Sequence, residues 1–210
     1  LQKLWAVLAA KAAAAKPGSL VHEDLPLTRR VLRDVVSSGI DKVTVDHAET
    51  CDSMVEFSRT FMPEMAGRIE VYTGPIFDLY AVEEEIQKSL ERKVPLKSGG
   101  HLVFDQTEAM TTIDVNTGAY VGHRNLEETI FRTNLEAAVA IARQLRLRNL
   151  GGIIIIDFID MEEEEHRRQV LQALEKALGM DHAKTHISSV SPLGLVEMTR
   201  KRTRESLEHL

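Results

Sequence analysis

Short apolar runs, separated by polar turns and by longer amphipathic stretches, dominate the pattern of this chain. Two of these runs end abruptly in a carboxylate, one at Asp114 and one at Asp157, and the second follows four consecutive isoleucines, Ile153–Ile156. Apolar runs this short are typical of buried strands, so both aspartates are expected at the carboxyl ends of strands. On neighbouring strands they would converge at one edge of a sheet.

The first part of the chain, up to about residue 89, alternates between helical and strand patterns. Apolar spacing predicts helices over 1–16, 25–38, 51–61 and 79–92, and alternation predicts strands over 42–46 and 69–72. Pro17-Gly18 is expected to end the first helix and Gly39 the second. The β-α-β-α order predicts a small α/β unit.

A different pattern begins after Ser98-Gly99-Gly100. Strands are predicted over 101–105 and 109–115, as a hairpin, and over 153–156, 185–190 and 194–198, with long helices over 125–148 and 162–178. The buried face of the longer helix is expected to carry Leu126, Ile130, Leu135, Val139, Ile141 and Leu145. The predicted fold class is α/β, in the mixed α+β sense.

Composition narrows the class of protein. The 210 residues allow one or two domains, and 43% hydrophobic with 28% charged residues is typical of a soluble globular protein. The sequence contains no run of 18 or more apolar residues, so no membrane span is predicted. Because the chain begins with Leu1, it is expected to be a fragment. The single Cys51 excludes an internal disulfide and a cysteine-based zinc site within one chain, so a reducing, cytoplasmic setting is expected.

Charge is unevenly distributed along the chain. The formal net charge of −6 does not indicate a nucleic-acid binder, but the C-terminal part is locally basic. Lys184 and the strip Arg200, Lys201 and Arg202 are candidates for contact with RNA phosphate. Arg143, with Arg146 and Arg148, is a further candidate, although a solvated helix end explains these three equally well.

The polar residues at the two strand ends suggest metal chemistry. Carboxylates forced together repel unless a cation lies between them, and Mg²⁺ suits an oxygen pocket with room for a phosphate. Asp114 and Asp157 are therefore candidate Mg²⁺ ligands, and Asn116, two residues along the same strand face, could orient a water molecule or contact phosphate. The alternative for Asp114 and Asn116 is a turn, and for Asp157 and Asp160 a helix cap.

Other site chemistries find no support in the sequence. The eight histidines lack the spacing of a zinc site. Neither a Gly-x-x-x-x-Gly-Lys-Ser/Thr loop nor a Gly-x-Gly-x-x-Gly motif is present, which argues against nucleotide-driven motors and dinucleotide enzymes.

Four segments resemble the ribonuclease E/G family. They read LKSGG at 96–100, DQTEAMTTIDVNTG at 105–118, ARQLRLRNLGGIIIIDFIDM at 142–161 and GLVEMTRKR at 194–202. The clear resemblance covers about residues 69 to 210, and the N-terminal third matches more loosely. At 111–118 and 199–206 the amino-acid sequence is closer to that of the G-type members than to that of the E-type members.

The resemblance implies a bacterial endoribonuclease that cuts single-stranded, often AU-rich RNA and prefers a 5′-monophosphorylated end. Its members process ribosomal RNA and start messenger decay. Hydrolysis at phosphorus with Mg²⁺ would leave 5′-phosphate and 3′-hydroxyl ends. The family's two metal-binding aspartates match Asp114 and Asp157, and its catalytic asparagine matches Asn116, which agrees with the interpretation reached from the strand ends.

The resemblance also implies a division of the chain. Residues 1–28 match the end of a 5′-sensor region, 29–89 a ribonuclease-H-like subdomain, and 90–210 a deoxyribonuclease-I-like catalytic subdomain. An arginine that helps to grip the 5′-phosphate matches Lys184, and lysine keeps the charge without the fork geometry. The family's oligonucleotide-binding barrel is missing. The Cys-x-x-Cys zinc link between subunits would lie beyond Leu210, so a zinc-linked homo-oligomer is expected only of the full-length parent.

Two other functions remain open from the sequence. One is a non-catalytic RNA-binding fragment whose acidic residues are only caps and turns. The other is a metal-dependent DNA nuclease or phosphatase built on a similar sheet. The isolated chain is also expected to cleave poorly, because substrate positioning supplies much of the rate.

Overall fold

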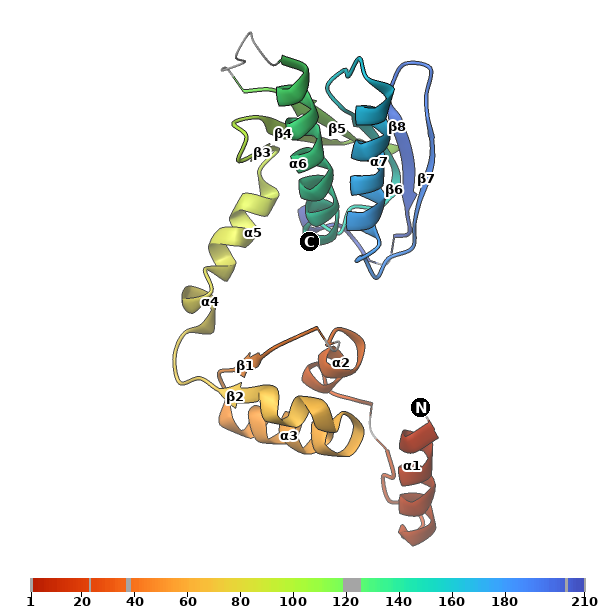
Figure 1. Ribbon diagram of the computed structural model, residues 1–210. Helices are drawn as coiled ribbons and strands as arrows, with labels where there is room; N and C mark the ends of the chain where they lie inside the picture. Colours follow the sequence, from red (N-terminus) through yellow and green to blue (C-terminus); the bar gives the residue numbers. More distant parts are fainter. Residues whose placement is uncertain (1, 23, 37–38, 119–125, 203, 210) are drawn as a thin grey trace. The chain divides into compact units, whose positions relative to one another are not determined.

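The computed structural model describes residues 2–22, 24–36, 39–118, 126–202 and 204–209 (Figure 1). The chain divides into two compact units, Leu1–Glu83 and Glu84–Leu210. The mixture of helices with a mixed sheet confirms the predicted α/β class in its α+β form. The finer division into three subdomains stays a prediction. Among the described residues, no helix is both long and apolar enough to span a bilayer.

The first unit is built around a parallel pair of short strands. In chain order it contains α1 (Gln2–Ala14), α2 (Leu27–Asp34), β1 (Val43–Val45), α3 (Ala48–Phe61), a 3₁₀ turn (Pro63–Arg68), β2 (Ile69–Val71) and α4 (Ile76–Leu79). Strand β1 pairs with β2, and α3 makes the crossover between them. The core of the unit consists of Leu32, Val45, Cys51, Met54, Phe57 and Ile69. The predicted α/β unit is therefore present, with α2 shorter than expected.

The helix predicted over 79–92 is present but begins later than expected, at Val82. Helix α4 ends at Leu79, and α5 (Val82–Leu90) begins three residues later. Between them Ala81 adopts φ 49°, a left-handed conformation that an α-helix does not contain. The apolar spacing by four residues in this stretch was a correct signal for helix, but it did not reveal the break.

The second unit is a six-stranded sheet with strand order β3-β4-β5-β6-β8-β7. The strands are β3 (Lys93–Pro95), β4 (His101–Gln106), β5 (Met110–Asn116), β6 (Gly152–Asp157), β7 (Thr185–Val190) and β8 (Val196–Arg200). Strands β5 and β6 are parallel, and the other neighbouring pairs in this described sheet are antiparallel. The predicted hairpin between β4 and β5 is confirmed. The short strand β3 was not predicted, since its three residues carry no apolar run.

Two long helices, α6 (Leu126–Leu147) and α7 (Glu164–Leu178), lie side by side on one face of this sheet (Figure 1). Alternate strand residues meet them in one core, which includes Leu102, Phe104, Ile113, Val115, Ile154, Ile156, Val196 and Met198. The residues between these positions, including Asp114, Asn116 and Asp157, therefore project from the opposite face, which we call the open face.

The buried face of helix α6 is rich in alanine. Ala137, Ala138 and Ala142 are at most 2% exposed, next to Ile141 and Leu145. The prediction was right for Ile141 and Leu145 but wrong for Leu126 and Val139, which are 49% and 55% exposed. A pattern of large apolar residues misses a helix face on which small residues make the contact.

A buried arginine fixes the end of α6. Arg148 is fully buried, so it is not the solvated or RNA-contacting residue considered from the sequence. Its guanidinium donates hydrogen bonds to the carbonyl oxygen of Glu91 (2.5 Å) and to Gln144 Oε1 (3.0 Å), and it pairs with Glu208 Oε1 at 3.3 Å. It also lies 4.6 Å from the ring centroid of Phe104. One side chain thus ties three segments to the sheet.

Arg148→Leu is expected to lower the free energy of unfolding by about 2–4 kcal/mol, because it leaves buried acceptors and a carboxylate without their donor. Urea denaturation followed by circular dichroism measures the change. Arg146→Leu is the matched control, since Arg146 is exposed on the same helix turn and its loss should cost about 0.5 kcal/mol or less. Equal costs for the two variants would contradict a structural role for Arg148.

Candidate active site

The two aspartates that end the apolar runs lie side by side. Asp114 in β5 and Asp157 in β6 are register partners in the parallel pair. Neighbouring strands are about 4.8 Å apart, and paired residues project to the same side of a sheet. Both side chains are exposed on the open face. Asp114 and Asn116 belong to a regular strand rather than to the turn that was the alternative.

Electrostatic strain marks this pair. Partial burial raises the pKa of the Asp157 carboxyl above its ordinary value, and the negative charges of Asp114 and Asp160 raise it further. The ionised pair is therefore less stable than two separate carboxylates would be. A cation held between them would relieve the repulsion.

Asn116 completes a compact polar group with the aspartates. Its side-chain nitrogen Nδ2 donates a 2.8 Å hydrogen bond to Asp114 Oδ2. In the described part of the chain no donor to its side-chain carbonyl oxygen is found, so that oxygen can accept a hydrogen bond from water. The residue predicted to act with the aspartates is thus in direct contact with one of them.

A glycine turn closes against the end of β5. A Cβ atom at Gly100 would lie 2.6 Å from the backbone oxygen of Asn116, and one at Gly118 would lie 2.2 Å from the backbone oxygen of Gly99. Both distances are too short for a side chain, so only glycine permits this approach. The carboxylate of Glu136 on α6 accepts hydrogen bonds from the amides of Lys97 and Ser98 and fixes the same turn.

The segment after Asp157 is held by a buried asparagine. Asn134 on α6 is fully buried, and its side-chain nitrogen donates to the carbonyl oxygen of Ile159 at 2.8 Å. Its side-chain oxygen accepts a 3.1 Å hydrogen bond from the amide of Ile159. This two-point clamp acts two residues beyond Asp157 and fixes how the chain leaves β6.

Asp160 does not cap the following helix, although the sequence suggested that it could. The residue before α7 is Glu163, and its side chain makes no capping hydrogen bond. Instead Glu127 Oε1, from α6, accepts hydrogen bonds from the amides of Glu162 and Glu163. It also lies 3.2 Å from His166 Nδ1. The capping carboxylate therefore comes from a distant part of the sequence.

The predicted basic residues lie near the other end of β6. Lys184 and Lys201 are exposed and line a groove of about 430 Å³ beside Gly152, the first residue of that strand. Exposed Arg202 donates to the carbonyl oxygen of Gly151 at 3.0 Å. Five residue steps along a strand are about 16 Å, so this basic end is well separated from Asp157.

Arg200 and Arg143 occupy different surroundings from the rest of the predicted set. Arg200 is 5% exposed and forms a buried ion pair with Asp181, 2.7 Å between Nε and Oδ2. It also donates to the carbonyl oxygen of Leu150 at 2.7 Å, so its guanidinium is turned inward and holds the fold. Arg143 is exposed but lies 3.1 Å from Glu85 Oε2. Its contact with phosphate would have to compete with that carboxylate.

The donor set fits a Mg²⁺ ion. Two adjacent carboxylates with an amide alongside are hard oxygen ligands, and Mg²⁺ is commonly held by one or two carboxylates while substrate phosphate and water complete its shell. In the parts of the chain that the structure describes, no cluster of three or more His, Cys, Asp or Glu residues is found. A site that depends on more protein ligands, such as structural zinc, therefore has no support among those residues.

The profile of the ribonuclease E/G family matches residues 1–203. The chain belongs to the ribonuclease E/G family. It is 58% identical to ribonuclease G of Salmonella typhimurium (strain SL1344) and 57% identical to ribonuclease G of Escherichia coli (strain K12), over all of this chain and 43% of each relative. Its identity to ribonuclease E of Escherichia coli (strain K12) is 41%, over 94% of this chain and 19% of that relative.

The expected closeness to the G-type members of the ribonuclease E/G family is thus confirmed, and the chain spans less than half the length of those relatives. The structure confirms the predicted strand-end positions of Asp114, Asn116 and Asp157, while their roles in a metal site stay a prediction. The sequence analysis did not identify Asn134 and Glu127, whose side chains hydrogen-bond the loop between β6 and α7. The available signal was a polar residue inside the apolar face of a helix, a position where a buried hydrogen bond is needed.

The raised pKa of Asp157 gives a pH-dependent prediction. The folded state binds the proton more tightly than the unfolded state, so the metal-free chain loses stability as pH rises from about 4 through the raised pKa. Asp157→Asn removes this titration, and its thermal midpoint in EDTA should exceed that of the unaltered chain at pH 7. The gain should disappear below about pH 4.

Asp105→Asn is the control for that experiment. Its carboxyl hydrogen-bonds the Arg92 guanidinium, which lowers its pKa, so the same change there should reduce the midpoint at pH 7. A lower midpoint for Asp157→Asn at pH 7 would show that the two carboxylates do not strain the fold.

Asn134→Ala is expected to lower the free energy of unfolding by about 2 kcal/mol, because two backbone groups of Ile159 lose their partner. It should also speed hydrogen exchange of the Ile159 amide, read by NMR. Arg132→Ala on the same helix removes only an exposed ion pair with Glu128 and should cost about 0.5 kcal/mol or less. If Asn134→Ala and Arg132→Ala lower the free energy of unfolding equally, the hydrogen bonds from Asn134 to Ile159 do not stabilise the fold.

Proposed function

We propose that this chain is the catalytic part of a Mg²⁺-dependent endoribonuclease that cleaves single-stranded RNA. The single observation that carries the proposal is the pairing of Asp114 with Asp157 on neighbouring parallel strands, with Asn116 in contact with Asp114. Family membership supports the choice of RNA as the substrate. Ribosomal RNA processing and messenger decay are the roles that we propose for the longer protein.

The residues of the proposed site would have different roles in the reaction. Asp114 and Asp157 would hold Mg²⁺ and leave the rest of its shell for water and a phosphate oxygen. When bound, the ion supplies charge neutralisation at the scissile phosphate and acidifies water at neutral pH. Asn116 would orient the attacking water or a phosphate oxygen through its side-chain carbonyl or amide. Attack at phosphorus with departure of the 3′ oxygen gives a 5′-phosphate and a 3′-hydroxyl.

Binding of the RNA backbone would use the exposed cations at the other end of β6. Lys184, Lys201 and Arg202 surround its first residue and can attract phosphates upstream or downstream of the cleaved bond. Sensing of a 5′-phosphate by Lys184, homo-oligomer formation, a zinc link through cysteines of the longer protein and a cytoplasmic location stay predictions.

The main test compares variants of the paired carboxylates. Asp114→Asn and Asp157→Asn are each expected to lower cleavage of a fluorogenic single-stranded RNA in Mg²⁺ by two orders of magnitude or more, because the metal loses a ligand. RNA binding, read by fluorescence anisotropy, should change little. The increase in thermal midpoint on adding Mg²⁺ should be lost in both variants.

Asp105→Asn is the matched control, since it removes a carboxylate of strand β4 that pairs with Arg92 and not with Asp114 or Asp157. Its cleavage rate should equal that of the unaltered chain. Full cleavage by Asp114→Asn or Asp157→Asn would refute the assignment. Equal turnover of RNA, single-stranded DNA and a phosphomonoester would favour the broader nuclease or phosphatase, and RNA binding without Mg²⁺-dependent cleavage would favour a non-catalytic RNA-binding module.

A further inference from the structure

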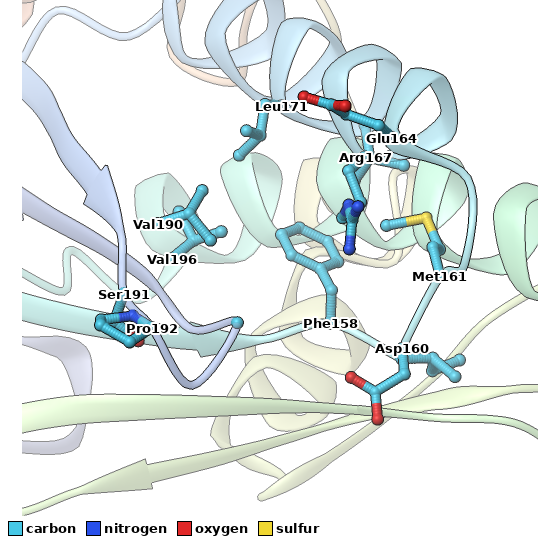
Figure 2. A pocket seen from close by; sticks show the side chains of 13 residues that line it. Phe158, Asp160, Met161, Glu164, Arg167, Leu171, Val190, Ser191, Pro192 and Val196 are labelled. Carbon is cyan, nitrogen blue, oxygen red and sulfur yellow. The ribbon is translucent and has the colours of Figure 1, made fainter.

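A cavity opens beside the carboxyl end of β6, on the side of the sheet that carries the helices (Figure 2). Its volume is about 350 Å³. The walls come from the segment after β6, from the first turns of α7 and from the turn between β7 and β8. None of the residues assigned to the metal site lines it. The cavity is therefore distinct from the proposed metal site.

The cavity and the paired aspartates share one edge of the sheet. Phe158, a wall residue, directly follows Asp157. Because consecutive side chains project to opposite faces, Asp157 lies on the open face while Phe158, 8% exposed, turns toward the helices. The clamp of Asn134 on Ile159, another wall residue, holds this division in place. A strand of RNA that crosses the edge at Asp157 thus passes the mouth of the cavity.

The lining combines apolar surface with one uncommitted cation. Phe158, Leu171, Val190 and Val196 form apolar walls, and Figure 2 shows the Arg167 side chain reaching from α7 toward Phe158. Among the described residues, no hydrogen-bond or ion-pair partner of the Arg167 guanidinium is found. Its neighbours Arg168 and Glu165, in contrast, pair with each other. A planar guanidinium beside an aromatic ring is a common arrangement for holding a nucleobase.

The charge of the lining selects the kind of ligand. Asp160 and Glu164 also border the cavity, so its carboxylates outnumber Arg167. A phosphate would be repelled there, whereas a neutral, flat ring with acceptor atoms would bury its faces against the apolar walls and accept hydrogen bonds from Arg167. Single-stranded RNA can turn out an unstacked base in this way, whereas a duplex would first have to break a base pair and pay the cost of unstacking.

We propose that this cavity binds one base of the RNA, adjacent to the cleaved bond, and so contributes to the choice of cleavage site. The proposal rests on the proposed function, because the RNA backbone must cross the Asp114–Asp157 pair. Phe158 and the aliphatic walls cover the faces of the base, and Arg167 contacts its edge. A base bound at this point would also favour the single-stranded substrate that we propose.

The test is a scan with abasic RNA. Binding of the 210-residue chain to a labelled single-stranded oligonucleotide is measured by anisotropy without Mg²⁺, with one abasic nucleotide placed at each position in turn. One position next to the bond that is cleaved in Mg²⁺ should weaken binding about tenfold, the usual scale of one stacked base. In Arg167→Gln and in the cavity-filling Val190→Phe this loss should shrink to about twofold or less.

Arg168→Gln is the matched control, because it removes the same charge from the same helix outside the cavity and should keep the tenfold loss. Circular dichroism and thermal midpoints establish that the exposed positions 167 and 190 tolerate the changes. The same abasic profile in both cavity variants as in the unaltered chain, or a profile without a sensitive position, overturns the base pocket.

Cleavage in Mg²⁺ separates this proposal from the nuclease proposal. RNA cleavage without a base position coupled to Arg167 refutes the pocket alone. A position coupled to Arg167 in a chain whose Mg²⁺-dependent cleavage is unchanged by Asp114→Asn refutes the nuclease assignment and leaves the base pocket supported. Asp114→Asn should retain the sensitive position, because contact with the base does not require the metal.

Discussion

The parallel pairing of β5 with β6 is the constraint on which the second unit depends. The α6 crossover between these strands lets both run in the same direction, so that two residues far apart in sequence, Asp114 and Asp157, become register partners. Partial burial of Asp157 and, after it, the negative charges of Asp114 and Asp160 oppose ionisation here, as the raised pKa of Asp157 indicates. Burial of Ile154 and Ile156 against the helices holds the strands in register, because a shift by one residue would expose them.

Polar side chains of one helix, buried or partly buried, fix the loops that surround this pair. Asn134, Glu127 and Glu136, all on α6, each accept or donate hydrogen bonds at the backbone of a segment that leads to or from the sheet. These hydrogen bonds to one helix add to the apolar contacts of Leu96 and Phe158 in setting the paths of those segments. Arg148 and Arg200 do the same near the other end of the sheet. Helix α6 is thus both a packing element and a scaffold for the site.

The two faces of the sheet have different chemistry at the same edge. The open face presents carboxylates and an amide, which suit a metal and a phosphate, and the helix side presents an apolar cavity with one arginine. Alternation along β6 creates this difference within two consecutive residues, Asp157 and Phe158. A flexible single strand can place its backbone on one side of such an edge and a base on the other. We see in this geometry a simple physical basis for coupling cleavage to base recognition.

The sequence by itself determined the mixed fold class, the β4–β5 hairpin and the strand-end location of Asp114, Asn116 and Asp157, because these depend on local periodicity and on the point where apolar runs stop. It could not determine which basic residues face solvent, since Arg200 and Lys201 are adjacent in sequence yet one is buried and the other exposed. Nor did it reveal the break at Ala81, the clamp by Asn134 or the alanine-rich face of α6. The burial of Arg200, the clamp by Asn134 and the packing of α6 depend on contacts between segments distant along the chain, and only the tertiary structure decides which segments meet.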